Sequence, residues 1–252
     1  MNTETPSTGS AGLQYLDVVR HLIERLATEE WAQLRSAAEL VATAVGTGHA
    51  VHAFGTGHGH MLAEELFYRA GGLVRVRPIL FEGLMLHASG PLSTALERLP
   101  GVAAALLDDH HVAAGDVLIV ASNSGGNAVV SEMVQLAQER GLRVIAVTSV
   151  RHATSPAARP TGFSRIHALA DVVIDNGGAV GDAAVHIDGF DRAVAPTSTV
   201  VGATVLNAVV AESVQIMVDR GIIPEVYESS NMAGGDVTNA PLNEAARQEA
   251  TS

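Results

Sequence analysis

The chain has 252 residues, which is enough for one α/β domain with a large core or for two small domains at most. Its formal charge of −12 argues against a nucleic-acid or anionic-membrane partner, because such partners need clustered cations. Lysine and cysteine are both absent, which excludes a lysine Schiff base, a P-loop, a thiol nucleophile and a thiolate metal site. The N-terminus shows no basic start followed by an apolar stretch, so we expect a cytoplasmic protein without a signal peptide.

The first part of the chain predicts two helices followed by a strand, a helix and a second strand. Residues 1–12 are rich in Thr, Ser, Gly and Pro, and we expect them to be disordered. From residue 13 to residue 45, apolar side chains recur every three or four positions, which predicts two helices. Gly46 and Gly48 are the stop signals that follow them. The next apolar runs predict, in order, a strand over 50–54, a helix over 61–70 and a strand over 73–80.

The middle of the chain continues this alternation. It predicts strands over 117–121, 143–148 and 170–175, and a helix over 128–140. Strands separated by helices imply right-handed crossovers and a parallel sheet. We therefore predict a three-layer α/β domain over 13–223 with a five-stranded parallel sheet. The strand over 117–121 is expected inside this sheet and not at its edge.

The C-terminal part begins with a long apolar segment over 200–218. Its length would allow a membrane span, but polar residues such as Asn207 and Glu212 are too many for a lone spanning helix. A buried core helix tolerates such residues when they are hydrogen-bonded, so we expect a core helix. We expect this helix to start near Ser198, because hydroxyl groups can cap its N-terminus. Beyond the helix the periodicity is lost, and we expect an extended arm over 224–252.

The most informative loop is the hexapeptide Ser-Asn-Ser-Gly-Gly-Asn over 122–127. It connects a buried strand to a helix, a geometry that presents backbone N–H groups and hydroxyls to an anion at the helix N-terminus. Because the loop has no cationic side chain, it suits a small phosphate monoester better than a polyphosphate with its metal. Two further predicted strands are followed by loops rich in Gly and hydroxyl groups, over 55–60 and 148–156. Because the strands are parallel, all three loops are expected at the same edge of the sheet. Ordinary turns also favour such residues, but three loops in register favour an anion site.

A dinucleotide site is the competing interpretation of the loop over 55–60. Gly55-Thr56-Gly57 begins the glycine fingerprint, and Glu82 after the second predicted strand could hold a ribose. However, His60 stands at the third glycine position, so the fingerprint is incomplete. The dinucleotide interpretation is therefore the weaker one.

The three loops resemble those of the sugar isomerase (SIS) domain family over roughly residues 13–223. The segments Ala63-Glu64-Glu65-Leu66 and Asp175-Asn176-Gly177 are most similar to uncharacterised single-domain sugar-isomerase-like proteins and to phosphoheptose isomerases. The resemblance implies a flavodoxin-like strand order, a homodimer and a sugar-phosphate ligand that is bound without a cofactor. The residues that it implies for phosphosugar binding are Gly55, Gly57, His58, Ser122, Asn123, Ser124, Gly125, Asn127, Thr148, Ser149 and Ser155.

The resemblance also suggests a reaction. Aldose–ketose isomerisation needs a carboxylate that moves a proton between adjacent carbons. Phosphoheptose isomerases use the second glutamate of an Ala-Glu-Glu-Leu segment, so we expect Glu65 to be the base, with Glu64, His60 and His87 as alternatives. Which of the two glutamates faces the site stays open, since neighbours on a helix point about 100° apart. Both could instead lie on a solvated face and pair with Arg69.

We expect no metal ion in the site. Phosphoheptose isomerases bind zinc with a histidine four residues before the second glutamate, and this chain has Met61 at that position. His58 and His60 form a His-x-His motif, but the motif lies in a loop that enters a helix, where a metal site is not expected. A further departure is Gly59, because the first loop of the family usually offers a serine hydroxyl there.

Two other functions stay open. The protein could be a non-catalytic phosphosugar sensor that acts through protein contacts, since no DNA-binding segment is visible. Ser198-Thr199 heads a helix similar to that of N-acetylmuramic acid 6-phosphate etherases, but Arg69 lies near the position where those lyases carry a glutamate. Turnover of a hexose or heptose phosphate would separate an isomerase from a sensor.

Overall fold

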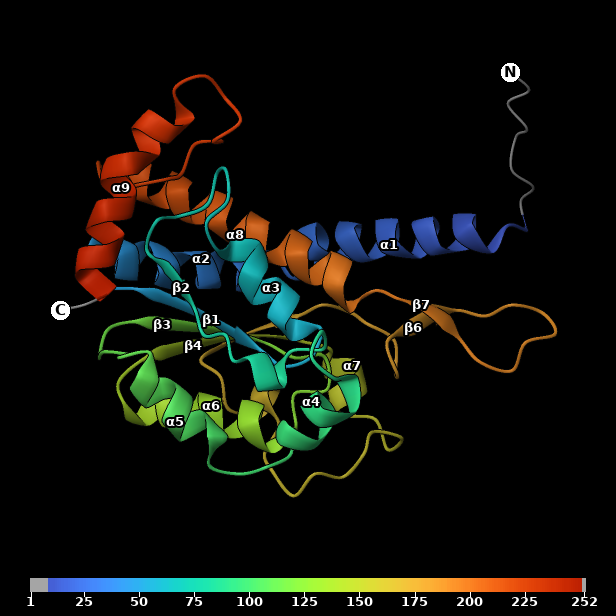
Figure 1. The fold of residues 1–252 in the computed structure, drawn as a ribbon. Helices are drawn as coiled ribbons and strands as arrows, with labels where there is room; N and C mark the ends of the chain where they lie inside the picture. The colour runs from blue at the N-terminus through green and yellow to red at the C-terminus, as the bar shows by residue number, and fades with distance from the viewer. Residues whose placement is uncertain (1–8, 251–252) are drawn as a thin grey trace, which may run out of the picture.

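A parallel β-sheet with the strand order β2-β1-β3-β4-β5 forms the middle of the computed structural model, which describes residues 9–250 (Figure 1). This flavodoxin-like order confirms the predicted fold class, and β3 is the central strand, as predicted. The strands are β1 (Val51–Gly55), β2 (Val76–Pro78), β3 (Val117–Ala121), β4 (Arg143–Thr148) and β5 (Val172–Asp175).

Helices cover both faces of this sheet and complete the three layers (Figure 1). Helices α1, α2, α3 and α8 pack on one face, and α5 and α6 pack on the other. The helices are α1 (Ala11–Thr28), α2 (Trp31–Gly46), α3 (Gly59–Leu66), α4 (Gly90–Leu96), α5 (Val102–Asp109), α6 (Ala128–Glu139), α7 (Val150–Ala153), α8 (Ser198–Asp219) and α9 (Gly235–Ala250), with short 3-10 turns at Glu82–Leu84 and Ile166–Ala168.

Strand β3 shows how the sequence specifies the layers. Successive side chains of a strand point to opposite faces of the sheet. Ile119 therefore packs into the cluster under α2 and α8, whereas Leu118 and Val120 pack into the cluster formed with α5 and α6. Because both faces are covered, all residues of β3 are buried and the strand is a continuous apolar run.

Helix α8 is the one described helix that is long and apolar enough, by length and composition, to cross a membrane. In this fold it packs against α1, α2 and α3, with Val201, Val205 and Val209 buried. Its buried Ser213 hydroxyl donates to the carbonyl oxygen of Val209 (2.6 Å). The helix therefore has the packed face and the satisfied polar group that were predicted for a core helix.

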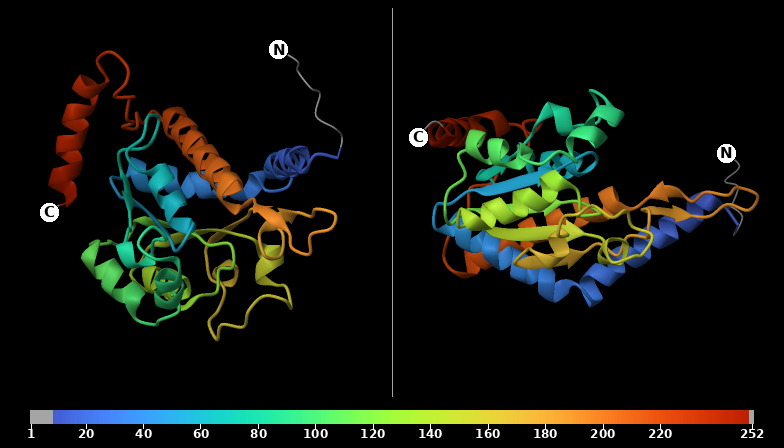
Figure 2. Two further views of the ribbon diagram at one scale, coloured as in Figure 1. Left: turned by 45° about the vertical axis from the view of Figure 1, so that its right-hand side comes forward. Right: turned by 90° about the horizontal axis from the view of Figure 1, so that it is seen from below.

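A hairpin that the sequence did not predict precedes α8. Strands β6 (Ala183–Val185) and β7 (Val194–Pro196) pair antiparallel outside the main sheet. The hairpin lies beside α1, and both extend away from the body of the molecule (Figure 2). The Tyr15 hydroxyl on α1 donates to the carbonyl oxygen of Pro196 (2.9 Å), which ties the two together.

The two ends of the chain differ from the expectation. Of the segment 1–12 that we expected to be disordered, residues 1–8 lie outside the described residues, and α1 already begins at Ala11. The arm expected to be extended over 224–252 contains helix α9. The sequence after Pro241 consists mainly of Leu, Glu, Ala, Arg and Gln, and these strong helix formers explain the difference.

Candidate functional site

A cavity of about 350 Å³ lies at the carboxyl ends of the parallel strands. This volume is within the usual range of small-molecule sites, ~300–1,000 Å³. Its walls come from the loops after β1, β3 and β5, and from the N-terminal residues of α3 and α8. Residues from the first two of the three predicted loops meet here, since the cavity is lined by Gly57, His58, Ser122, Asn123, Ser124 and Asn127, and the third loop contributes His152.

The loop over 122–127 is folded by its own hydrogen bonds. The Ser122 hydroxyl accepts from the backbone N–H of Gly125 (3.1 Å), and the Arg165 guanidinium donates to the carbonyl oxygen of Ser124 (2.6 Å). Gly125 has a φ of +61°, and a Cβ atom there would lie 2.8 Å from the side chain of Ile166. Gly125 thus shapes the loop from behind and does not line the cavity.

The N-terminus of α6 opens into this loop. Asn127 occupies the N-cap position, but its side chain makes no capping hydrogen bond. The backbone N–H of Val129 donates to the carbonyl oxygen of Glu97 (3.1 Å). The N–H groups of Asn127 and Ala128 have no hydrogen-bond partner within the described part of the chain. The positive end of the helix dipole is therefore open to an anion.

The first loop approaches the sheet very closely. A Cβ atom at Gly55 would lie 2.4 Å from the backbone of Gly59, and one at Gly59 would lie 2.5 Å from the carbonyl oxygen of Ala121. A side chain at Gly59 would displace the backbone, so the loop in this conformation requires glycine at this position. Gly55 holds the loop against α3, and Gly57 and the exposed His58 reach the cavity.

Thr148 and Ser149 lie behind the cavity and support its wall. Both are fully buried. The Thr148 hydroxyl donates to the carbonyl oxygen of Asn123 (3.2 Å), and the Ser149 hydroxyl donates to the carbonyl oxygen of Gly178 (2.7 Å). Ser155 also lies away from the cavity, where its hydroxyl accepts from the N–H of Ala157 (3.2 Å).

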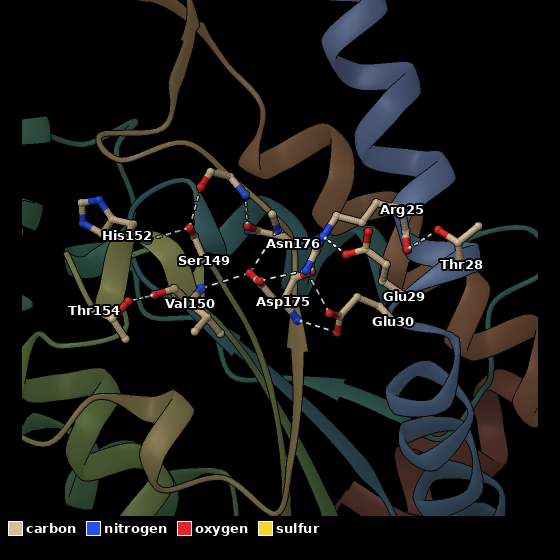
Figure 3. Close-up of polar contacts among 12 residues, drawn as sticks. Arg25, Thr28, Glu29, Glu30, Ser149, Val150, His152, Thr154, Asp175 and Asn176 are labelled. Carbon is tan, nitrogen blue, oxygen red and sulfur yellow. Dashed lines mark hydrogen bonds and ion pairs between the residues drawn. The ribbon is translucent and has the colours of Figure 1, made fainter.

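An arginine from α1 holds the end of β5 in place. Figure 3 shows Arg25 beside Asp175, where its guanidinium donates to the carbonyl oxygen (2.9 Å) and to Oδ2 (3.1 Å) of Asp175. It also donates to Glu30 Oε1 (3.0 Å), and Glu30 Oε2 accepts from the N–H of Asp175 (3.2 Å). The adjacent Asn176 lines the cavity and donates through Nδ2 to Asn123 Oδ1 (3.1 Å). The α1–α2 junction thus positions one wall of the site.

Asp182, which also lines the cavity, caps α8. Its Oδ1 accepts from the N–H groups of Thr197 (3.1 Å) and Ser198 (2.9 Å), and its Oδ2 accepts from the Ser198 hydroxyl (2.5 Å). A negative charge is favourable at this position because it opposes the helix dipole. Both carboxylate oxygens of Asp182 are therefore already used by the protein.

None of the four predicted catalytic side chains lines this cavity. Glu65 forms an ion pair with Arg69 and accepts from Asn207 of α8 (2.8 Å). Glu64 is exposed, and His87 forms a surface ion pair with Glu82. His60 is buried, which lowers its pKa to about 4, and its Nε2 accepts from the N–H of Phe81 (3.4 Å).

The His-x-His motif is also split by the fold, because His58 lines the cavity and His60 is buried outside it. Within residues 9–250, no group of three or more His, Asp or Glu side chains is placed to hold a metal ion. The donor set of the cavity is instead dominated by hydroxyls, amides and backbone N–H groups.

Several side chains that line the cavity were not predicted from the sequence, among them Thr56, Glu97 and His152. Glu97 follows α4, and its Oε2 accepts from the Thr56 hydroxyl (2.7 Å). Helix α4 was not predicted, although Ser89 followed by Gly-Pro is a typical helix start and its hydroxyl accepts from the N–H of Leu92 (3.3 Å). That capping signal predicts the start of α4, but not that the end of the helix brings Glu97 to the cavity.

The chain is similar to proteins of a known family. A family model described as the SIS domain matches residues 14–149. A UPF0309 protein of Listeria monocytogenes serotype 4b is 39% identical over 228 residues, which cover 90% of this chain and 92% of that protein. The chain belongs to the SIS domain family, within its UPF0309 group. Another UPF0309 relative of this SIS protein, from Brucella canis, is 43% identical over 213 residues, or 84% of this chain and 86% of that protein.

Two solved structures share the fold of this SIS protein. A phosphoheptose isomerase from Neisseria gonorrhoeae has a TM-score of 0.51 and 19% identity, and covers 81% of this chain and 95% of its own. A phosphoheptose isomerase from Francisella tularensis has a TM-score of 0.50 and 15% identity, with 80% and 95% coverage. At these identities the likeness establishes the fold alone.

Proposed function

We propose that this SIS protein binds a sugar phosphate in the cavity, with the phosphate group on the loop over 122–127. The observation that carries the proposal is the open N-terminus of α6, where the N–H groups of Asn127 and Ala128 are unpaired beside Ser122 and Ser124. A phosphate monoester suits this site, because backbone N–H groups, hydroxyls and the helix dipole all favour a small dianion.

We further propose that the protein isomerises its ligand between aldose and ketose forms. The fold that it shares with two phosphoheptose isomerases supports this choice. The cavity also supports it, because a carboxylate and an imidazole line the wall beside the phosphate loop. We place the protein in the cytoplasm as a homodimer, without a nucleic-acid or membrane partner, in keeping with its charge of −12.

A thermal-shift screen tests the binding proposal. The panel contains pentose, hexose and heptose phosphates, the matching neutral sugars and inorganic phosphate. We expect a sugar phosphate to raise Tm well above the shift given by the neutral sugar or by phosphate alone, because ligand that binds only the folded state stabilises it. A panel in which no sugar phosphate moves Tm would contradict the proposal.

A further inference from the structure

We propose that Glu97 and His152 are the proton-transfer pair of the cavity: Glu97 moves a proton between adjacent carbons, and His152 moves a proton between the oxygens on those carbons. This inference rests on the proposed function and names the residues that would perform its chemistry. Both side chains line the cavity, and both are half-buried.

Glu97 is the one carboxylate of the described cavity wall with an unused oxygen. The other carboxylate, Asp182, gives both oxygens to the N-terminus of α8. Glu97 Oε2 accepts from the Thr56 hydroxyl (2.7 Å), whereas Oε1 has no partner within residues 9–250. No arginine or histidine of the described residues lies within ion-pair distance of Glu97, so its charge is not neutralised by the protein. An oriented, unpaired carboxylate is what a general base requires.

The backbone of Glu97 is held as firmly as its side chain. Its carbonyl oxygen accepts from the N–H of Val129 (3.1 Å) in the first turn of α6. This bond fixes Glu97 to the same helix end that presents the proposed phosphate site. The carboxylate thus has a set position relative to a phosphate bound at Ser124 and Asn127. Such fixed geometry is a main source of rate enhancement when a reacting atom is held close to a catalytic group.

His152 is held in one tautomer by the backbone. Its Nδ1 lies 3.0 Å from the N–H of Gly181, and a backbone amide can only donate. Nδ1 is therefore the acceptor, and the neutral ring carries its proton on Nε2, which has no partner within the described residues. Burial and the nearby Arg165 guanidinium lower the pKa of His152, so the neutral form prevails near pH 7.

Together, Glu97 and His152 can carry out every proton transfer of an aldose–ketose isomerisation. In an open-chain aldose, Glu97 takes the proton from C2, and the C–H electron pair forms the C1–C2 double bond. The carbonyl oxygen at C1 takes the proton of His152 Nε2, which gives an enediol and leaves the ring as an imidazolate. The ring then takes the proton of the C2 hydroxyl, a carbonyl forms at C2, and Glu97 returns its proton to C1. A carboxylate base with a neutral histidine is an established solution for this chemistry.

Deuterium exchange tests the pair. The best sugar-phosphate binder from the screen is incubated with protein in D₂O, and NMR follows deuterium at C1 and C2. We expect exchange with the wild-type protein and a loss of ~10²-fold or more for Glu97→Gln and for His152→Gln, with sugar-phosphate affinity retained in calorimetry. Glu97→Gln keeps an oxygen that can accept from Thr56, and Glu139→Gln, an exposed change at the far end of α6, is the matched control.

The outcomes separate this inference from the proposed function. If no sugar phosphate binds, the proposed function fails. If the wild-type protein binds and exchanges, but Glu97→Gln exchanges at the same rate, the pair is overturned and binding stands. Tight binding without any wild-type exchange also overturns the pair and favours a sensor. Loss of exchange in Glu65→Gln alone assigns the base to Glu65. If Glu97→Gln does not fold, Glu97→Asp, which shortens the reach of the carboxylate, must show the same loss.

Discussion

Asp116 organises the end of the sheet opposite the cavity. Its Oδ1 accepts from the N–H of Ala50 (2.9 Å), and its Oδ2 accepts from the N–H of Ala113 (2.9 Å) and lies 3.0 Å from Nε2 of the buried His52. Burial opposes its ionisation, but the hydrogen bonds from His52, Ala113 and Ala50 outweigh burial and lower the pKa of Asp116 to about 2. A single carboxylate thus joins β1, β3 and the loop before β3.

We predict that Asp116→Asn destabilises the fold by about 2 kcal/mol at pH 7, because its lowered pKa means that the folded state prefers the charged form. This contribution is complete above the unfolded pKa near 3.8 and is lost as pH falls towards 2. Urea unfolding at several pH values measures it. The wild-type protein should lose stability below pH 4 more steeply than Asp116→Asn. Equal acid dependence of the two proteins would contradict the assignment.

At the scale of elements, the contact between α1 and β5 matters most for the site. Arg25 bonds Asp175 through both its carbonyl and its carboxylate, and Asp175 Oδ1 accepts from the N–H groups of Val150 and Gly177 (both 3.0 Å). The loop that follows carries Asn176 into the cavity. A helix that does not itself line the cavity therefore fixes one of its walls.

We predict that Arg25→Met lowers the unfolding free energy by about 1–2 kcal/mol and weakens sugar-phosphate binding, because Asp175 and Glu30 lose their shared cation. The value is below that of a fully buried pair because the Arg25 side chain is 25% exposed. Arg20→Met is the control, since Arg20 pairs with Asp17 and Glu24 on the exposed face of the same helix. Equal effects of the two changes on binding would contradict a role of Arg25 in the site.

The elements that the sequence predicted share one property, which is a strong local signal. The buried strands and the Ser-Gly loop over 122–127 follow from apolar runs and from turn residues. Helix α4 has only seven residues, too few to show a helical periodicity, and Glu97 was missed with it. Glu65 was chosen by resemblance, but its direction depends on packing: Asn207 and Arg69 hold its carboxylate away from the cavity. The spacing of residues in the sequence does not reveal such tertiary contacts.

At the scale of the whole molecule, large apolar side chains remain exposed on helices α1 and α8. Leu16 of α1 is 62% exposed and Val218 of α8 is 53% exposed. We predict a homodimer that buries such side chains, so Leu16→Glu should dissociate it, whereas Leu99→Glu, at an exposed site after α4, should not. Sedimentation at micromolar concentration measures both variants. A wild-type monomer under these conditions would refute the prediction.

The central claim is that the loop over 122–127 binds the phosphate of a sugar phosphate. Calorimetric titration of the best binder into the wild-type protein and Ser124→Ala tests it most directly, with Ser36→Ala as a control on the exposed face of α2. We predict a loss of about 1–3 kcal/mol for Ser124→Ala, because a hydrogen bond to a charged group is removed, and no change for Ser36→Ala. Equal affinity of the wild-type protein and Ser124→Ala for the sugar phosphate would contradict the claim.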